Sequence, residues 1–424
     1  MSVRKKIRKA LKTFSVWKNR KMLFFFFKEN AKNSFNIKRR IGFFTPLPPA
    51  QTGTAEYALK TYSTLLDDLD FISDFKTIEE YTETLNRISD KYKSHVIVQH
   101  FLKQTQKTYD HIILNLGNSY FHVPYLKYGI ETKGKENRHI VLCETQLCGM
   151  LNAYCSETEK KNFKTFLKRY YPEKAHVIDE AEEIWEPFAK NNIFGIRAVI
   201  ELTGIKHFFT YREIGKKMLK DDIAGMPYEK DVSVTLMPPV LEAVKDIRPT
   251  DLKCSGVSIG SFGIASDIKQ TDKVIKAVDL LNETGVPATL FLAGYDVARY
   301  CRKHPSDHVK AYENTDYDTL LSLIKSVDIA VQLRKFSLGE GSGCLAECLA
   351  LNKKLIAAEN LVEPVFKDFC HLVSSDISIE NLAEALLKEI QRKQEPDTSR
   401  LIETYTVEKV GKKMLDVLEG MPNA

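Results

Sequence analysis

The sequence lacks any long apolar run. No stretch approaches the roughly 18 to 20 apolar residues that a membrane-spanning helix requires, although apolar residues make up 43% of the 424. The eight cysteines are scattered singly, and pairs such as Cys143/Cys148 and Cys344/Cys348 miss the spacing of zinc knuckles and have no nearby histidine pair. These absences argue against a membrane-embedded protein and against a zinc site, and they predict reduced thiols in a cytosolic protein.

Acidic residues are almost missing from residues 1–40. This segment holds fourteen Lys or Arg and a single acid, Glu29, so its net charge is +13, whereas the whole chain carries +6 and the other 384 residues sum to −7. Aromatic residues, including Trp17 and the phenylalanines at 24–27, interleave with the basic ones. A basic aromatic segment of this kind is typical of an arm on an anionic membrane surface, at about 1 kcal/mol per basic residue.

Other interpretations of this arm stay open. Basic tracts with aromatic residues also suit phosphate backbones and base stacking, but the acidic remainder disfavours a nucleic-acid groove, so we expect no nucleic-acid partner. The arm could also be solvated or packed against the fold. We expect no cleaved secretory signal, because only about six apolar residues follow Lys21 and no small-residue cleavage site comes after them.

The chain is too long for one ordinary core. At 424 residues we expect two domains of about 150 to 200 residues each. Short apolar strands alternate with amphipathic helices, which predicts an α/β chain with two doubly wound parallel sheets. The predicted strands are 41–44, 112–116, 140–143, 207–210 and 233–236, and then 256–260, 288–293, 329–333 and 354–357. We therefore predict an arm at 1–40, domains at 41–245 and 246–395, and a C-terminal helix at 396–424 that packs back on the first domain.

Two loops after predicted strands carry the residue types of an anion site. Ligands of open α/β sheets bind beyond the carboxyl ends of the strands. In the first loop, Ser261 and Gly263 give backbone freedom, and Lys269 precedes a helix expected near Thr271. A close backbone, a lysine and a helix start suit a diphosphate, although many connecting loops also carry a Gly and a Lys.

The second loop runs from Arg334 to a helix that carries Glu347. Between them lies the run Gly339-Glu340-Gly341-Ser342-Gly343. Free amides can hold phosphate oxygens, while carboxylates accept hydrogen bonds from ribose or sugar hydroxyls. Glu340 or Ser342 could instead simply cap the helix, but three glycines exceed what a cap needs.

Four segments in a fixed order carry a more specific signal. They are the run GFFTPLPPAQTGTAEY at 42–57, the run GNSYFH at 117–122, Phe262-Gly263 with Lys269, and the run VDIAVQLR at 327–334 followed by 339–343. Together, over about residues 40 to 395, they resemble the bacterial family-four glycosyltransferases of the surface-glycan type.

This resemblance implies a GT-B fold, in which two doubly wound Rossmann-like domains face a cleft. It also implies a metal-independent enzyme that transfers a hexose, with retention at the anomeric carbon, from a nucleotide-diphosphate sugar to a glycan or lipid-linked glycan in surface polysaccharide synthesis. The donor is a co-substrate, and no further cofactor is expected. With the basic arm, we expect a cytoplasmic protein on the inner face of the cell membrane.

The resemblance also implies roles for individual residues. The catalytic positions are His122, over the donor sugar, and Glu340, on its hydroxyls. Lys269 and Arg334 would neutralise the leaving diphosphate, whose charge grows in the transition state. The donor-binding positions are Gly53, Ser261, Gly263, Lys269, Arg334, Ser342, Gly343, Cys344 and Glu347.

Three features depart from the family pattern. Ile264 stands where many relatives carry an Arg, and we take Arg334 as its hypothetical substitute. Glu340 and Glu347 are seven residues apart rather than eight, and Cys143-Glu144 stands where relatives often have His-Asp. Two alternatives therefore stay open, namely a catalytically silent GT-B protein that binds nucleotide sugar or glycan as an assembly partner, and another two-domain α/β enzyme such as a sugar epimerase.

Two paired-aspartate patterns resemble those of metal-dependent sugar transferases. They are Asp68-Leu69-Asp70 and Asp316-Tyr317-Asp318. Both fall in stretches that we expect to be helical or connecting. We therefore interpret them as solvated acids and expect no metal site.

Overall fold

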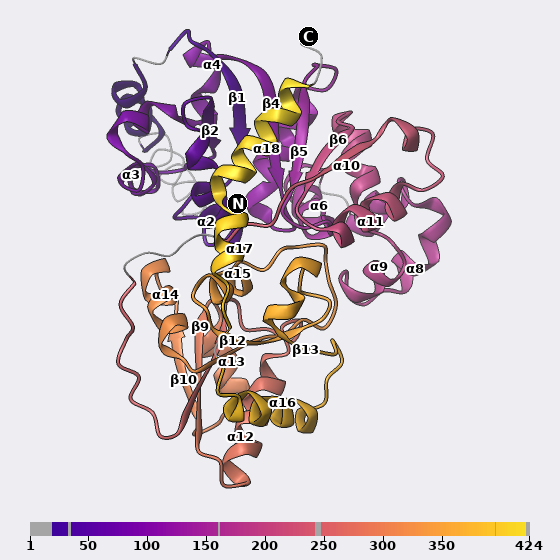
Figure 1. Ribbon diagram of the computed structural model, residues 1–424. Coiled ribbons are helices and arrows are strands. Elements are labelled where there is room, and N and C mark those ends of the chain that lie inside the picture. Colours follow the sequence, from indigo (N-terminus) through magenta and orange to yellow (C-terminus); the bar gives the residue numbers. More distant parts are fainter. Residues whose placement is uncertain (1–18, 33–34, 160–161, 242–246, 395, 421–424) are drawn as a thin grey trace, which may run out of the picture. The chain divides into compact units, whose positions relative to one another are not determined.

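The computed structural model describes residues 19–32, 35–159, 162–241, 247–394 and 396–420. These residues form two compact units, each a sheet with helices around it (Figure 1). Unit 1 holds the described residues up to Met237, together with Leu338–Glu340 and the chain from Val410 onward. Unit 2 holds the described residues from Pro238 to Ser337 and from Gly341 to Lys409. Within the described ranges, every helix is too short or too polar to span a lipid bilayer.

Unit 1 is built on a seven-stranded sheet. Its strand order is β3-β2-β1-β4-β5-β6-β7, and all neighbouring strands are parallel. The strands are β1 (Lys38–Phe44), β2 (Leu69–Ser73), β3 (Val96–Val98), β4 (Thr108–Leu116), β5 (Arg138–Leu142), β6 (His207–Thr210) and β7 (Ser233–Leu236). The order reverses between β1 and β4, and ligands of doubly wound sheets bind beyond the strand ends at such a point.

The crossovers of unit 1 are helical. Their helices are α2 (Gly53–Tyr62), α3 (Ile78–Asn86), α4 (Leu102–Thr105), α5 (Val123–Glu131), α6 (Cys148–Tyr154), α7 (Phe163–Lys168), α8 (Ala175–Glu180), α9 (Glu186–Lys190), α10 (Ile196–Thr203) and α11 (Glu213–Ile223). The last helix of the chain, α18 (Val407–Glu419), belongs to unit 1 from Val410 onward. There Gly411 lies against Leu65, and the Glu419 carboxylate accepts a hydrogen bond from Arg40 at 2.8 Å.

Unit 2 repeats the plan with six parallel strands in the order β10-β9-β8-β11-β12-β13. They are β8 (Val257–Phe262), β9 (Ala288–Gly294), β10 (Val309–Glu313), β11 (Ile329–Gln332), β12 (Lys354–Ala358) and β13 (His371–Val373). The helices are α12 (Thr271–Glu283), α13 (Val297–Lys303), α14 (Tyr317–Ser326), α15 (Gly343–Ala350), α16 (Ile379–Gln391) and α17 (Ser399–Thr404).

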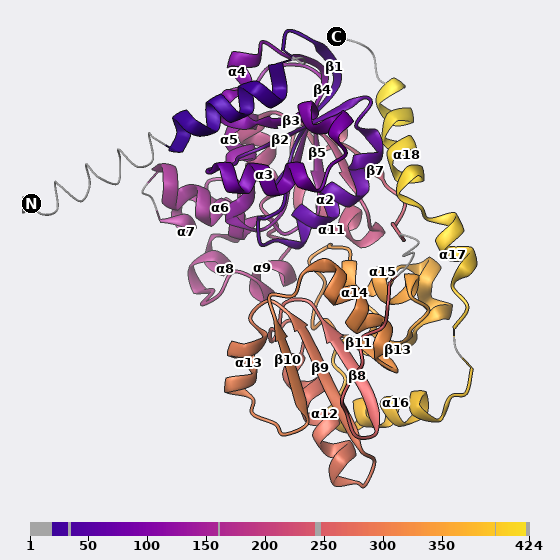
Figure 2. The ribbon, with the colours of Figure 1, turned by 90° about the vertical axis from the view of Figure 1, so that its left-hand side faces the viewer.

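Helices cover both faces of the unit 2 sheet (Figure 2). Along β11, Ile329 and Val331 point into a core filled by α12 and α16, while Ala330 points into a second core filled by α14 and α15. A strand that is buried on both faces is apolar throughout rather than alternating. This explains why the apolar runs of the sequence predicted β11 and its neighbours well.

All nine strands predicted from the sequence form, and the structure adds four that the sequence did not reveal, β2, β3, β10 and β13. Strands β3 and β13 are only three residues long, and β10 is a mostly exposed edge strand. Such segments bury too little apolar surface to give a clear pattern.

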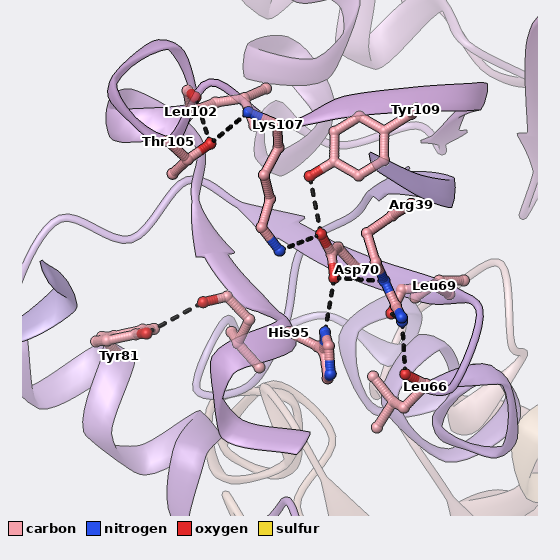
Figure 3. Close-up of polar contacts among 11 residues, drawn as sticks. Arg39, Leu66, Leu69, Asp70, Tyr81, His95, Leu102, Thr105, Lys107 and Tyr109 are labelled. Atoms are coloured by element: carbon pink, nitrogen blue, oxygen red, sulfur yellow. Dashed lines mark hydrogen bonds and ion pairs between the residues drawn. The ribbon is translucent and has the colours of Figure 1, made fainter. Parts of the chain in front are cut away.

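The interpretation of Asp70 as a solvated acid was wrong. Asp70 lies in β2, and its side chain is completely buried. Its carboxylate accepts hydrogen bonds from Lys107 Nζ at 2.6 Å, from Tyr109 at 3.0 Å and from His95 Nδ1 at 2.9 Å, and it pairs with Arg39 at 3.3 Å (Figure 3). Burial alone would raise the pKa of Asp70, but His95, Lys107 and Arg39 together hold it below the usual range.

Asp316 and Asp318, the second paired-aspartate pattern, are exposed to solvent, as the sequence predicted. Asp316 is the N-cap of α14, where its side chain accepts a hydrogen bond from the Thr319 amide, and Asp318 is exposed in the first turn. The two patterns therefore differ in burial, because only the first contains a buried charge, that of Asp70.

The described part of the basic arm belongs to unit 1. Strand β1 already begins at Lys38, and a helix spans residues 19–31. Leu23, Phe27 and Ala31, one helical turn apart, are buried. The remaining residues of the arm, 1–18 and 33–34, lie outside the described residues.

We expect Asp70→Asn to destabilise unit 1 by about 3 to 5 kcal/mol, because it leaves the fully buried ammonium of Lys107 without its counter-charge. Urea unfolding followed by circular dichroism measures the change. Asp318→Asn is the matched control, because it removes an exposed carboxylate and should leave the unfolding midpoint in place. An Asp70→Asn variant as stable as the wild type would contradict the structural role of this carboxylate.

Candidate functional site

The first loop at the carboxyl edge of unit 1 joins β1 to α2. Thr52 caps α2, accepting a hydrogen bond from the Thr54 amide, and Gly53 is the exposed first residue of the helix. A side chain added at Gly53 would meet no atom within 4 Å. The structure therefore leaves open space at the position where the sequence predicts an approach of the donor phosphates.

The second loop carries His122 and joins β4 to α5. His122 ends the short helix Tyr120–His122 and is almost completely buried. Its Nδ1 donates to the Asn115 carbonyl at 2.9 Å, so Nε2 is the acceptor nitrogen of the neutral ring. A Cβ on Gly117 would lie only 2.9 Å from Nε2, so the ring needs the glycine above it.

Burial determines the charge of His122. It lowers the pKa of the imidazole to about 4, although the hydrogen bond to Asn115 works in the opposite direction. The neutral ring can accept or relay a proton, but it supplies no positive charge near pH 7. Its catalytic role over a donor sugar stays a prediction.

Sequence reasoning did not identify the residue that anchors the His122 loop. Glu144, directly after Cys143, accepts a hydrogen bond from the Asn118 amide at 2.7 Å, and the Asn118 side chain accepts one from the Gly149 amide at 2.6 Å. The loop is therefore tied to the start of α6. The position of Glu144 after a strand, where the family has another residue, was the available signal.

The thiol and the phenol groups near the His122 loop keep their protons. The Cys143 thiol donates to Asn115 Oδ1 at 2.8 Å, and burial raises its pKa to about 12. Tyr62 and Tyr211 share a hydrogen bond between their hydroxyls, and the ring of Tyr57 lies edge-on to Tyr211 with centroids 5.3 Å apart. Burial raises the pKa of both Tyr62 and Tyr211 well above the ordinary value.

Glu340 belongs to unit 1 by its contacts. Its Oε2 accepts a hydrogen bond from the Leu338 amide at 2.7 Å, and its carbonyl accepts one from Arg212 at 3.1 Å. The Leu338 carbonyl in turn accepts from the Thr145 amide at 2.8 Å. One carboxylate oxygen of Glu340 thus stabilises its own turn, and its role in binding sugar hydroxyls stays a prediction.

The carboxyl edge of unit 2 has a small hollow where β8 ends. Ser261, Gly263, Ile264, Lys269 and Thr271 are among its lining residues. Gly263 has a φ of +100°, and a Cβ there would come within 2.4 Å of Lys269 Nζ. Only glycine at this position lets the ammonium lie directly on the backbone at the strand end.

Lys269, Arg334 and Glu347 come together around Cys344. The pKa of the Cys344 thiol is raised to about 12, mainly by burial and further by the Glu347 carboxylate, while Lys269 and Arg334 oppose the rise. The two loops are also joined directly, because the Lys335 amide donates to the Ile268 carbonyl at 2.8 Å. The structure therefore brings together four residues that the sequence placed in the donor site.

Gly343 and Cys344 open α15 beside these charges. The hydroxyl of Ser342 accepts a hydrogen bond from the Leu345 amide at 3.3 Å, so Ser342 is the N-cap, as the simpler interpretation of that residue expected. Amides at a helix N-terminus attract anions. Two cations and a helix start at one strand edge suit a phosphate group, and Glu347, 9% exposed, adds a hydrogen-bond acceptor.

Comparison with known proteins identifies the fold. No protein-family model and no curated protein matches this sequence. Among solved structures, Anabaena HepE, crystallised with UDP-glucose, is 12% identical, with a TM-score of 0.60 over 90% of this chain and 100% of its own. The trehalose-6-phosphate synthase OtsA is 10% identical, with a TM-score of 0.57 over 91% and 100%.

A third structure agrees with these two. The UDP-forming α,α-trehalose-phosphate synthase of Burkholderia xenovorans, crystallised with glucose-6-phosphate, is 10% identical, with a TM-score of 0.55 over 90% of this chain and 100% of its own. Together the likenesses show an α/β protein of the GT-B fold, with two doubly wound Rossmann-like domains, as the sequence predicted.

We expect the His122 imidazole to titrate with a midpoint near pH 4, and proton NMR of the ring, assigned with a His122→Gln variant, measures it. The unfolded state binds the proton near the ordinary value of 6.5, so the stability that His122 contributes is present above that pH and is lost as the pH falls toward 4. A midpoint at pH 6 or above would contradict the buried, neutral ring.

Proposed function

We propose that this protein is a retaining glycosyltransferase that moves a hexose from a nucleotide-diphosphate sugar to a glycan acceptor. The observation that carries the proposal is the meeting of Lys269, Arg334 and Glu347 at the start of α15. The GT-B fold and the four segments that resemble family-four glycosyltransferases support it. Two of the compared proteins act with or bind a UDP compound, which fits a donor of this class.

The charges of unit 2 suit a leaving diphosphate. Negative charge grows on the diphosphate in the transition state, and fixed cations stabilise it without reorganising. In the proposed complex, Lys269 and Arg334 neutralise this charge, the amides at 342–344 hold phosphate oxygens, and Ser261 and Gly263 lie alongside. Glu347 accepts hydrogen bonds from the ribose. Arg334 would also replace the arginine that Ile264 displaces, so the proposed transfer needs no divalent metal.

The residues of unit 1 would act on the sugar. Gly53 leaves space for the donor, and neutral His122 lies in the loop that we place near the anomeric carbon. Glu340 would accept hydrogen bonds from the sugar hydroxyls through its carboxylate. We nominate no protein nucleophile.

We also propose a place of action. The acceptor is a growing surface glycan or a lipid-linked glycan, and the protein works on the cytoplasmic face of the cell membrane. The basic aromatic character of residues 1–40 supports this location, because such segments bind anionic lipid surfaces.

We expect one of UDP, GDP, ADP and CMP to bind in the micromolar range with EDTA present, measured by isothermal titration calorimetry. Lys269→Ala should weaken that binding roughly ten- to hundredfold, because a hydrogen bond to a charged group is lost. The matched control is Lys276→Ala, an exposed lysine on α12, the helix that follows Lys269, where it pairs with Asp272. Equal affinity in the Lys269→Ala variant would remove Lys269 from the site.

Donor turnover separates the proposal from its alternatives. With the matching nucleotide sugar, we expect release of free nucleoside diphosphate at a rate that magnesium does not raise, followed by chromatography of the products. A silent binding protein would bind the donor and release nothing. An epimerase would instead yield an epimerised nucleotide sugar, and a strict need for magnesium would refute the metal-independent transfer.

A further inference from the structure

The helix over residues 19–31 has two different apolar sides. One side is part of the core of unit 1, where the ring of Phe27 stacks on Phe101 with centroids 5.7 Å apart and lies edge-on to Tyr81 at 6.1 Å. Phe24 adds an edge-on contact to Phe101 at 5.0 Å. The helix is therefore fixed to the fold by its buried side.

The other side exposes large apolar side chains to solvent. Met22 is 45% exposed, Phe25 is 58% exposed and Phe26 is 38% exposed. Residues at i, i+3 and i+4 share one face of a helix, so these three side chains form a single patch. We call it the outer patch. Met22 and Phe25 are the more exposed members, whereas the ring of Phe26 also lies edge-on to Tyr81 with centroids 6.2 Å apart, so Phe26 joins the outer patch to the core.

Basic residues surround the outer patch. Arg20, Lys21 and Lys28 are exposed on the same helix, Lys32 is exposed directly after it, and the only acid of the helix, Glu29, pairs with Lys32 at 3.2 Å. The preceding eighteen residues add seven further Lys or Arg and no acid. An apolar patch within a strongly positive segment matches a surface that offers both negative headgroups and hydrocarbon.

We propose that the outer patch is a membrane-docking surface, in which Met22, Phe25 and Phe26 enter the headgroup region of an anionic lipid bilayer while the basic residues bind the headgroups. A second copy of this chain fits less well, because pairing two outer patches would bring two sets of like charges together. This surface rests on the membrane location given in the proposed function, but it does not depend on the proposed sugar transfer. In this complex the lipid contacts a helix that is packed on the core of unit 1, rather than a free arm.

Vesicle flotation with the full-length protein tests this surface. We expect binding to vesicles that contain phosphatidylglycerol, weak binding to vesicles of phosphatidylcholine alone, and a decrease as salt rises. The triple variant Met22→Ser/Phe25→Ser/Phe26→Ser should bind anionic vesicles at least tenfold more weakly. Because Phe26 also contacts Tyr81, the double variant Met22→Ser/Phe25→Ser, which keeps this contact, should retain the unfolding midpoint of the wild type and still lose most of the binding, and Phe25→Ser alone, at the most exposed position, should show part of the loss.

A matched control removes exposed apolar residues elsewhere. Val365→Ser/Leu372→Ser changes two exposed side chains of unit 2 and should leave vesicle binding unchanged. Equal binding by the triple variant and the wild type would overturn the proposal, because residues outside the patch would then account for the attachment. A wild type that ignores anionic vesicles but forms a dimer that the triple variant abolishes would assign the patch to a second copy instead.

Discussion

The buried carboxylate of Asp70 constrains the whole amino-terminal edge of unit 1. A charge with no exposed surface is tolerated only with close counter-charges and hydrogen bonds, and Asp70 obtains them from β1, from the start of β4 and from the residue before β3. Strands β1 to β4 are therefore fixed at their starts, with Asp70 opposite Gly42 in the register of β1 and β2. The ends of the strands are nearly level, because Phe44 at the end of β1 pairs with Ile72 of β2 and Leu114 of β4, so the loops that carry Gly53 and His122 emerge at one edge.

A chain of hydrogen-bonded histidines crosses the other half of this sheet. His111 Nδ1 lies 3.1 Å from His139 Nε2, His139 Nδ1 lies 2.9 Å from His207 Nδ1, and His207 Nε2 lies 3.1 Å from the hydroxyl of Thr235 on β7. Burial first, and then the neighbouring histidines, lowers the pKa of His139 to about 3. These three histidines are therefore neutral near pH 7. They join β4, β5, β6 and β7 by hydrogen bonds, whereas the Asp70 cluster joins the other strands by charge.

Two kinds of feature could be predicted from the sequence: strands that are buried on both faces, and binding residues that directly follow strands. Strands buried on both faces gave apolar runs, and Lys269, Arg334 and Glu347 could be grouped because they all follow parallel strands of one sheet. Asp70 could not be recognised, because an acid in a short segment has the same local pattern whether solvent or Lys107 surrounds it. The two sides of the helix over 19–31 were hidden for a related reason, since four consecutive phenylalanines give no periodicity. Likewise, the burial of His122 depends on the absence of a side chain at Gly117, which is visible only in three dimensions.

The two units offer different chemistry at their carboxyl edges. In unit 2 the cations Lys269 and Arg334 gather with Glu347 at a helix start. Around the His122 loop of unit 1 the ring is neutral, Cys143 stays a thiol and the tyrosines keep their protons, and the Glu144 carboxylate binds the Asn118 amide of the loop itself. A diphosphate needs fixed positive charge, but a sugar needs hydrogen-bond donors and acceptors that do not compete for that charge. In glycosyl transfer from a nucleotide donor the leaving group is ionic and the transferred group is not, so the two groups need these different surroundings. The contrast between the two edges therefore supports the proposed transfer over a protein that only binds nucleotides, for which the ionic edge alone would suffice.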